Sequence, residues 1–355
     1  MPVALLGAGV IGRMHAARMR RSDDVVLAGV ADPSAAAREW AASQGVPWAA
    51  EPAQLLDRVR PAAAIVATPN ATHTEVALAC IERRIPLLVE KPIADDVVAA
   101  QRIADAARAA GVPVLVGHQR RHGAAVQRAR RMIAEGAIGR AVAVSMMAIW
   151  LKPASYFEAG EWRRRKGGGP VLINAIHDID LLRHLVGEIT AVHAFASNAE
   201  RGFEVEDTAA AVLKLKGGAG SAVATLLVSD AAVSPWNYDI VSGESELYPP
   251  QAADGLHIAG SEGALTVPQL LHWRYRGAAK HWHAELTQEQ TRLHQRDPYA
   301  EQLRHLRAVA EGREAPLCSA EDGIATLRAT LAVLESAASG RTVVLDGKAK
   351  TGGAS

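Results

Sequence analysis

Hydrophobic and polar positions alternate along the first third of this chain in a strand–helix rhythm. Short apolar runs are separated there by alanine-rich segments whose charged residues recur at helical spacing. Strands that alternate with helices predict βαβ units and a parallel sheet covered by helices on both faces. The predicted strands span residues 3–6, 25–31, 62–67, 86–89 and 113–116, and the predicted helices include 34–44, 72–84 and 95–110.

The rhythm changes after about Gly117, where longer segments alternate apolar and polar residues with period two. A glycine-containing turn at 214–218 joins two of these segments and is typical of a hairpin. We therefore predict an α/β Rossmann domain followed by an α+β domain with a large open, mostly antiparallel sheet. Its strands are expected at 141–149, 208–215, 219–228, 256–260, 264–267 and 272–275, and its helices at 172–186, 299–311 and 320–339.

This change places the domain boundaries. We expect an NAD(P)-binding Rossmann domain over 1–120, a substrate-binding and oligomerisation domain over 121–345, and a disordered polar tail over 346–355. Alternating apolar residues over 210–215 and 219–227 indicate that one face of the second sheet packs on another subunit. We therefore predict a homodimer or a homotetramer.

Composition narrows the class of protein. The 355 residues are 49% hydrophobic and 22% charged, with a formal net charge of +1, which suits two globular domains and indicates neither a nucleic-acid nor a membrane partner. The two cysteines, Cys80 and Cys318, form neither a disulfide framework nor a metal-binding pair and favour the reducing cytoplasm. We expect no signal peptide, and no apolar run approaches the ~20 residues that span a bilayer.

A glycine-rich loop follows the first predicted strand and opens a helix. Its sequence is Gly7, Ala8, Gly9, Val10, Ile11 and Gly12, which is the G-x-G-x-x-G pattern of dinucleotide-binding turns. Asp32 lies 20 residues beyond Gly12, at the end of the second strand, where a carboxylate accepts hydrogen bonds from the adenosine ribose. Because a carboxylate there repels a 2′-phosphate, we favour NAD over NADP as the cofactor.

Further motifs occur in a fixed order, and with them the chain resembles the Gfo/Idh/MocA family of oxidoreductases. The resemblance implies a Rossmann domain, a second α/β domain with an open sheet, and hydride transfer on sugars, cyclitols or related cyclic alcohols. It also implies that the motif residues contact the cofactor. These residues are Ala67, Thr68, Pro69, Asn70 and His73, then Glu90 and Lys91 before Pro92, and finally Trp162 and Arg163 ahead of the run from Gly167 to Asp180.

Lys91, His177 and Asn174 are the candidate catalytic residues. The ammonium of Lys91, after a parallel strand, can stabilise a developing alkoxide, and His177 has the near-neutral pKa that suits a general base. Many family members carry an aspartate four residues before this histidine, where this chain has Ile173. Asn174 is the nearest polar group, and its amide can orient a hydroxyl but cannot act as a base.

Other residues of the motif have alternative roles. Asp178 either orients the imidazole of His177 or faces solvent, and Asp180 is expected to make a structural hydrogen bond. The glycines at 167–169 are expected to give a flexible approach to the helix. The basic segment 163–166 is either a solvated loop or a contact for cofactor phosphate or a substrate carboxylate.

Substrate contacts are expected from residues at strand ends. We assign Arg120, Trp150, Tyr156, Lys91, Asn174 and His177 to the substrate, and Arg121, Lys152, Trp236 and Asn237 are weaker candidates. The histidines at 257, 272, 281 and 283 form no metal-ligand pattern, so we expect no metal.

The prediction from sequence is a dehydrogenase that oxidises a secondary alcohol on a ring to a ketone. The substrate class includes sugars, sugar acids, cyclitols and cyclic diols. Two alternatives stay open at this point: redox-assisted elimination by an NAD-dependent glycosidase, and a non-catalytic NAD-binding regulator. NADP-dependent reduction of a ketone would use the same site. Substrate identity, stereochemistry and physiological direction are not determined by the sequence.

Overall fold

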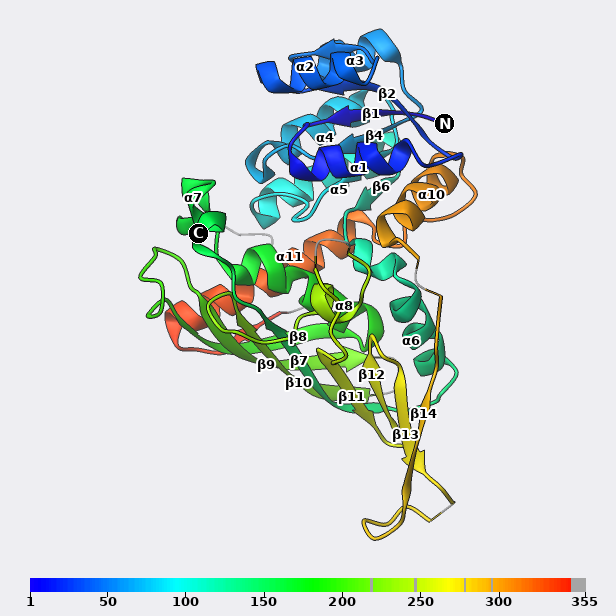
Figure 1. The fold of residues 1–355 in the computed structure, drawn as a ribbon, viewed down its shortest axis with the longest axis vertical. Helices are drawn as coiled ribbons and strands as arrows, with labels where there is room; N and C mark the ends of the chain where they lie inside the picture. The colour runs from blue at the N-terminus through cyan, green and yellow to red at the C-terminus, as the bar shows by residue number, and fades with distance from the viewer. Residues whose placement is uncertain (218–219, 246–247, 278, 295, 346–355) are drawn as a thin grey trace, which may run out of the picture. The chain divides into compact units, whose positions relative to one another are not determined.

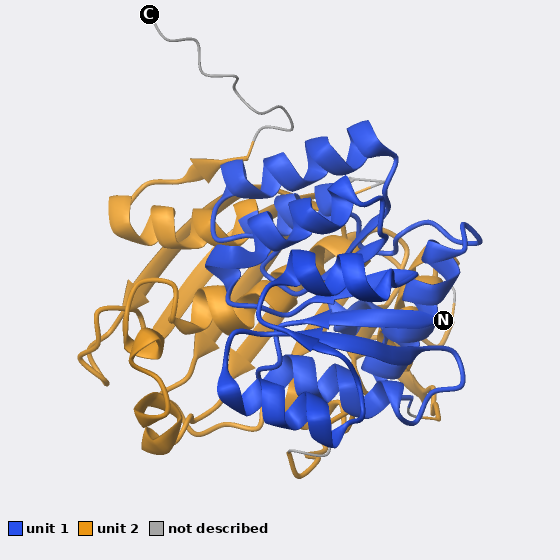
Figure 2. Cartoon of the chain, turned by 90° about the horizontal axis from the view of Figure 1, so that it is seen from above, with its two compact units in different colours: residues 1–123, 296–327 blue, residues 124–295, 328–355 orange. Residues whose placement is uncertain are grey.

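The computed structural model describes residues 1–217, 220–245, 248–277, 279–294 and 296–345 (Figure 1). The expected tail over 346–355 lies outside the described residues. The chain divides into two compact units (Figure 2). Unit 1 comprises Met1–Gly123 and Arg296–Leu327, and unit 2 comprises Ala124–Gln295 and Arg328–Ser355.

Unit 1 contains a six-stranded parallel sheet of the predicted Rossmann type, in the order β3-β2-β1-β4-β5-β6. All five predicted strands are present, and the short strand β3 and the helix α3 were not predicted. The strands are β1 (Pro2–Leu6), β2 (Val26–Ala31), β3 (Trp48–Ala49), β4 (Ala63–Val66), β5 (Leu87–Val89) and β6 (Val114–Val116). The helices are α1 (Val10–Met19), α2 (Ala35–Ser43), α3 (Pro52–Val59), α4 (His73–Glu82), α5 (Val97–Ala110) and α10 (Pro298–Ala310), with the 3-10 turns η1 (Asn70–Thr72) and η2 (Gln119–His122).

Helix α10 belongs to unit 1 although it follows most of unit 2 in sequence. Leu303, Leu306 and Val309 are buried in one core with Val3 and Leu5 of the parallel sheet. The structure therefore differs from the expected second domain of 121–345, because residues 296–327 return to the first. Leucines at helical spacing show that a helix buries a face, but they do not show which sheet covers that face.

Unit 2 contains a nine-stranded sheet in the order β14-β13-β12-β11-β7-β10-β9-β8-β15. Its pairings are antiparallel except that of β7 with β10, which is parallel. The strands are β7 (Ala141–Ile149), β8 (Glu188–Ser197), β9 (Thr208–Gly217), β10 (Gly220–Ser229), β11 (Leu256–Gly260), β12 (Ala264–Val267), β13 (Leu271–Tyr275), β14 (Leu286–Gln290) and β15 (Val343–Val344). The helices are α6 (Ala124–Ala134), α7 (Ala154–Glu158), α8 (Ile176–Leu185), α9 (Tyr238–Val241) and the later part of α11 (Ala320–Ser339), with a 3-10 turn η3 (Glu161–Arg164) and a π-helical turn η4 (Val171–Ala175).

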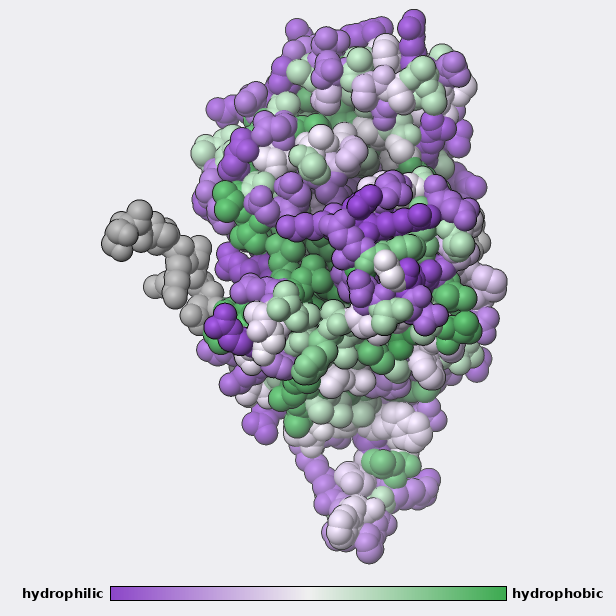
Figure 3. Space-filling model, turned by 90° about the vertical axis from the view of Figure 1, so that its left-hand side faces the viewer, coloured by the Kyte–Doolittle hydropathy of each residue, from purple (hydrophilic) through white to green (hydrophobic). Residues whose placement is uncertain are grey.

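The two faces of this sheet differ. Helices α6 and α8 pack on one face, where Val126, Ile179 and Leu213 share a buried core (Figure 1). The opposite face leaves apolar side chains exposed, among them Phe195 at 71% and Val223 at 54%. Figure 3 shows hydrophobic residues at the surface above the polar tip of the β13–β14 hairpin.

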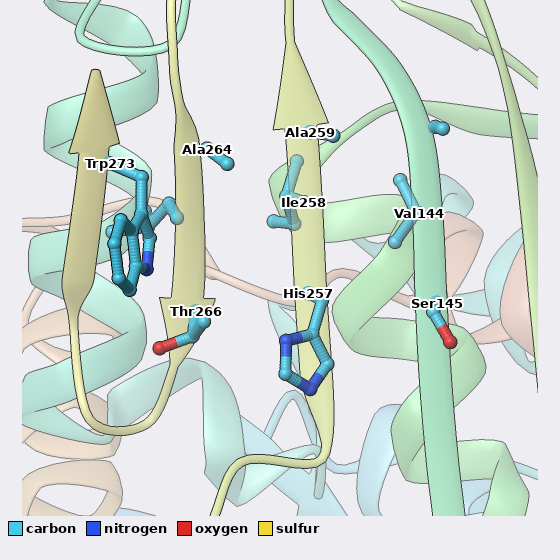
Figure 4. Close-up of a pocket in the computed structure, with 10 residues that line it drawn as sticks. Val144, Ser145, His257, Ile258, Ala259, Ala264, Thr266 and Trp273 are labelled. Atoms are coloured by element: carbon cyan, nitrogen blue, oxygen red, sulfur yellow. The ribbon is translucent and has the colours of Figure 1, made fainter. Parts of the chain in front are cut away.

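A shallow pocket of about 310 Å³ crosses strands β7, β11, β12 and β13 of this sheet (Figure 4). Ser145, His257, Thr266 and Trp273 line it, one from each strand. No helix in the described part of the chain is both long and apolar enough to cross a membrane.

Candidate active site

The glycine loop of unit 1 is shaped by close backbone packing. Gly7 has a φ of +97°, and a Cβ atom there would lie 2.5 Å from the carbonyl oxygen of Ala67. A Cβ atom on Gly12 would lie 2.1 Å from the carbonyl oxygen of Gly7. A Cβ atom on Gly9 would meet nothing within 4 Å. Two glycines are therefore required by the fold itself, and the third leaves open surface for a ligand.

The N-terminus of α1 suits the phosphates of a dinucleotide. Gly9 is the N-cap residue and supplies no side-chain cap to the first turn. The following Val10 is 81% exposed. Backbone N–H groups at the open end of a helix bind anions, and the helix dipole favours the negative charge. The residues present therefore fit the cofactor that the motif predicts.

Asp32 ties the glycine loop to the end of β2. Its Oδ2 accepts a hydrogen bond of 2.9 Å from the backbone N–H of Ala8. Its Oδ1 accepts bonds from the backbone N–H and the hydroxyl of Ser34 at 2.9 and 2.6 Å. Partial burial opposes ionisation, but these hydrogen bonds outweigh it and lower the pKa of Asp32. A carboxylate oxygen accepts about two bonds, so Asp32 keeps capacity for ribose hydroxyls.

The loops after β4 and β5 are joined by His73. These strands are parallel neighbours, so the loops at their carboxyl ends lie at one sheet edge. His73 is 1% exposed. Its two ring nitrogens lie 2.9 Å from the carbonyl oxygen of Pro92 and 2.8 Å from that of Thr68. Burial lowers the pKa of His73. His73 therefore holds the two loops together, and its predicted contact with cofactor stays a prediction.

Glu90 and Lys91 have different surroundings. Glu90 is 7% exposed, and its carboxylate lies 2.7 Å from Nε2 of His15 on α1. Burial opposes its ionisation, but the hydrogen bond and charge of His15 outweigh this and lower the pKa of Glu90. Lys91 is half-buried, and the Lys91–Pro92 peptide bond is cis.

In unit 2, four polar side chains from distant segments form a network that we call the Lys152 cluster: Lys152, Asn174, Arg201 and Asp230. The Lys152 ammonium donates to Oδ1 of Asn174 at 2.6 Å and to Oδ2 of Asp230 at 3.2 Å. The Arg201 guanidinium donates to Oδ1 of Asp230 at 2.9 Å. The side chains of Lys152 and Asp230 are 7% and 2% exposed.

The topology of the sheet explains why these residues meet. Lys152 follows β7 and Asp230 follows β10, and these parallel neighbours end together. The backbone N–H of Lys152 donates to the carbonyl oxygen of Asp230 at 2.9 Å. Arg201 lies in the β8–β9 connection, where Asp207 accepts its backbone N–H at 3.0 Å. Asn174 comes from the π-helical turn η4, a distortion that is frequent at functional sites.

The glycines before this turn allow close packing, and this replaces the expected flexible approach for two of them. A Cβ atom on Gly168 would lie 2.4 Å from the carbonyl oxygen of Trp162, and one on Gly169 would lie 2.2 Å from Oε1 of Glu206. Glu206 also accepts the backbone N–H of Val171 at 2.9 Å. Its carboxylate therefore holds the start of η4. Burial raises the pKa of Glu206.

His177 lies in the first turn of α8 and is 8% exposed. Asp178 and Asp180 are 0% and 1% exposed. Asp178 does not face solvent, which removes one of its two predicted roles. The burial of Asp180 agrees with the expected structural role.

The remaining candidates have varied environments. Arg163 stacks over the Tyr156 ring at 4.1 Å and donates to the carbonyl oxygen of Tyr156, whereas Trp162 is 55% exposed. The Trp150 ring lies 5.5 Å from that of Tyr248. Arg120 is 3% exposed. Their assigned contacts with cofactor and substrate stay predictions.

Some of the weaker candidates have structural partners. Asn237 is 1% exposed and caps α9, because its Oδ1 accepts the backbone N–H of Asp239. Arg121 donates to the carbonyl oxygen of Leu317 at 2.8 Å. His281 and His283 are exposed. In the basic segment 163–166, Arg165 is exposed and pairs with Glu161 and Glu204, so at least this part of the segment is solvated.

Sequence reasoning missed Asp230, Arg201 and Glu206. Asp230 had one available signal, a carboxylate directly after an alternating strand. Arg201 and Glu206 lie in a loop whose composition is ordinary, so no local pattern distinguishes them.

Comparison with known proteins identifies the family of the chain. Residues 1–118 match an oxidoreductase family with an NAD-binding Rossmann fold, and residues 126–266 match the GFO/IDH/MocA C-terminal domain. The chain belongs to the Gfo/Idh/MocA family and is an NAD-dependent oxidoreductase.

Its relatives include sugar and inositol enzymes. The 1,5-anhydro-D-fructose reductase of Ensifer adhaerens is 28% identical over 80% of each chain. The scyllo-inositol 2-dehydrogenase (NAD(+)) of Bacillus subtilis is 26% identical over 97% of this chain and 96% of its own. The WlbA dehydrogenase of Bordetella pertussis, solved with NADH and UDP-GlcNAcA, superimposes with a TM-score of 0.79 at 23% identity over 98% and 99% of the chains, which shows the shared fold.

Proposed function

We propose that this protein oxidises a secondary alcohol on the ring of a sugar, sugar acid, cyclitol or cyclic diol to a ketone. The observation that carries the proposal is that each of the two units contains a family motif. In unit 1, Lys91 lies in the loop after β5. In unit 2, His177 lies at the start of α8, directly after the π-helical turn η4. Named relatives act on anhydrofructose and inositols, which are ring polyols or ketones.

The proposed roles follow from the chemistry of the side chains. His177 accepts the hydroxyl proton, or Lys91 does so directly, and Lys91 stabilises negative charge on the reacting oxygen. Asn174 orients a substrate oxygen through its amide. NAD, when bound, supplies the acceptor for the hydride. The protein's own task is to hold the alcohol and move its proton.

The test is a set of absorbance measurements at 340 nm with NAD⁺, then NADP⁺, over sugars, sugar acids, inositols and cyclic diols. We expect turnover with one class, and a fall in kcat of about 10²- to 10⁴-fold in Lys91→Ala and in His177→Ala. The exposed residues Lys280 and His283 offer matched controls, and alanine there should preserve the rate. A silent panel with tight NAD binding would contradict this function and favour the regulator or the NAD-retaining glycosidase.

We further propose that the open face of the unit 2 sheet is the contact between copies of the chain. Exposed apolar residues such as Phe195, Val212 and Val223 support this, because a large exposed apolar face on a sheet usually marks an interface. Light scattering at micromolar concentration should show a dimer or tetramer, and Val212→Lys with Val223→Lys should shift it to monomer. A monomeric wild-type protein contradicts the proposal.

A further inference from the structure

The buried ammonium of Lys152, a weaker candidate for substrate contact, has no part in the catalytic roles proposed above. Its donors are directed to Asn174 and Asp230, and the charge lies 4.8 Å from the centre of the Tyr156 ring. A buried lysine costs free energy unless it is paired and hydrogen-bonded. The fold therefore maintains this charge for a reason other than solubility.

The contact with Asn174 sets the orientation of the asparagine amide. An ammonium group carries three donors and no acceptor. The atom of the Asn174 amide that lies 2.6 Å from the ammonium must therefore be the carbonyl oxygen. If it were the amide nitrogen, two hydrogen-bond donors would face each other. The two N–H donors of Asn174 are consequently turned away from Lys152, on a side chain that is only half-buried.

The rest of the cluster holds Lys152 in place. Burial lowers the pKa of Lys152, and the negative charge of Asp230 opposes that effect. Asp230 is itself held on its second oxygen by Arg201, whose guanidinium also donates to the carbonyl oxygen of Lys152 at 3.0 Å. The ammonium therefore has little freedom to release Asn174.

We propose that Lys152 is a positioning residue that fixes the Asn174 amide as a hydrogen-bond donor, so that the site selects substrates presenting an acceptor oxygen to Asn174. This inference rests on the proposed function, in which Asn174 contacts the substrate. A carboxylate, a ring ether or a carbonyl oxygen accepts a hydrogen bond from the amide without needing a proton acceptor in return. Asn174 consequently contributes to the binding and orientation of the substrate, and the proton of the substrate hydroxyl is transferred to another residue.

Asn174→Asp is the sharpest test, because it keeps the shape and retains an acceptor for Lys152. It changes the group that faces the substrate from a donor to an acceptor and adds one negative charge beside Lys152. We expect the substrate KM to rise about 10- to 100-fold, since a lost bond and a repulsive contact are worth about 1–3 kcal/mol. The kcat should change less, and thermal stability should stay the same.

Two results of that experiment would overturn the proposal. An unchanged KM means that Asn174 does not donate to the substrate. A higher kcat with a new acidic limb in the pH profile means that position 174 serves proton transfer and not orientation.

Lys152→Met tests whether the lysine acts through Asn174. We expect KM to rise about tenfold, because the amide is then free to rotate, and we expect Asn174→Asp to add less than its full effect in this background. Independent, multiplicative effects of the two substitutions would contradict the proposed coupling. If Lys152→Met does not fold, the pH response of the Asn174 side-chain signal in the wild-type protein decides.

A measurement without turnover separates this inference from the proposed function. In protein labelled at asparagine, the side-chain ¹³Cγ signal of Asn174 should titrate as Lys152 loses its proton, and the Lys152→Met variant should abolish that titration. If the Asn174 signal titrates but no substrate of the panel is turned over, the proposed function is rejected and the coupling of Lys152 to Asn174 is retained. An Asn174 signal that does not respond rejects the coupling, whatever the substrate panel shows.

Discussion

The glycine loop of unit 1 and the Lys152 cluster of unit 2 are built in opposite ways. The loop is shaped by backbone packing of consecutive residues and of the neighbouring Ala67, and the side chain of Asp32 ties it to the end of β2. The cluster uses side chains that come from a strand end, a π-helical turn, a loop and a second strand end. A site made of backbone recurs as a motif because few residues permit its geometry. A site made of side chains depends on which segments the fold brings together.

The same contrast applies to tolerance of substitution. In the loop, the constraint is steric, since two glycines have no room for a methyl group. In the cluster, the constraint is electrostatic, since buried cations need their carboxylate. Substitutions that affect one kind of constraint and spare the other test this comparison.

The largest effect is expected at Asp230. Asp230→Asn leaves the buried Lys152 and the partly buried Arg201 without their shared carboxylate, which should lower the free energy of unfolding by about 3–5 kcal/mol. Urea denaturation measures the loss. Glu285→Gln removes an exposed ion pair with Arg276 and should show almost no change. Equal losses in both variants would mean that the cluster carries no special electrostatic constraint.

The glycine loop should separate stability from cofactor binding. Gly12→Ala places a methyl group against the carbonyl oxygen of Gly7 and should cost about 3 kcal/mol of stability. Gly9→Ala meets no atom of the protein, so its Tm should match the wild type while NADH binding weakens at least tenfold. Thermal unfolding and NADH fluorescence titration measure the two quantities. A Gly9→Ala protein with normal affinity would remove the open surface at Gly9 from the cofactor site.

A smaller steric effect is expected in unit 2. Gly169→Ala brings a methyl group onto the Glu206 carboxylate and should cost about 1–2 kcal/mol, because that side chain can shift by losing its bond to Val171. Against a Glu206→Ala background the same change should cost less, as a double-mutant cycle would show. Additive losses would place the strain elsewhere.

The smallest effect concerns pH. Burial raises the pKa of Glu206 in the folded protein above its ordinary value of 4.5. Its contribution to stability is therefore complete below the pKa of the unfolded chain and is lost as pH rises through the folded pKa. Unfolding curves from pH 4 to 7 should show this decline, and Glu206→Gln should flatten it. An unchanged slope in the variant assigns the decline to another group.

Several features were correctly predicted from the sequence because they depend on local patterns. The strands of the Rossmann sheet, the hairpin pair β9 and β10, and the family itself follow from periodicity and ordered motifs. Strand β3 was missed because two residues carry no period. The placement of α10 was missed because its apolar face fits any core. The roles of the glycines at 168 and 169 were misread because close packing with Glu206 and Trp162 is not visible along the chain.

The sequence by itself determined the class of the enzyme, its cofactor loop and the candidates Lys91 and His177, because each depends on residues close together in the chain. Only the tertiary structure decided that Lys152, Asn174, Arg201 and Asp230 form one network. Parallel pairing of β7 with β10 puts residues 152 and 230 side by side, although 77 residues separate them. Contacts of that kind follow from strand order in the sheet, which no local pattern of hydrophobic and polar residues specifies.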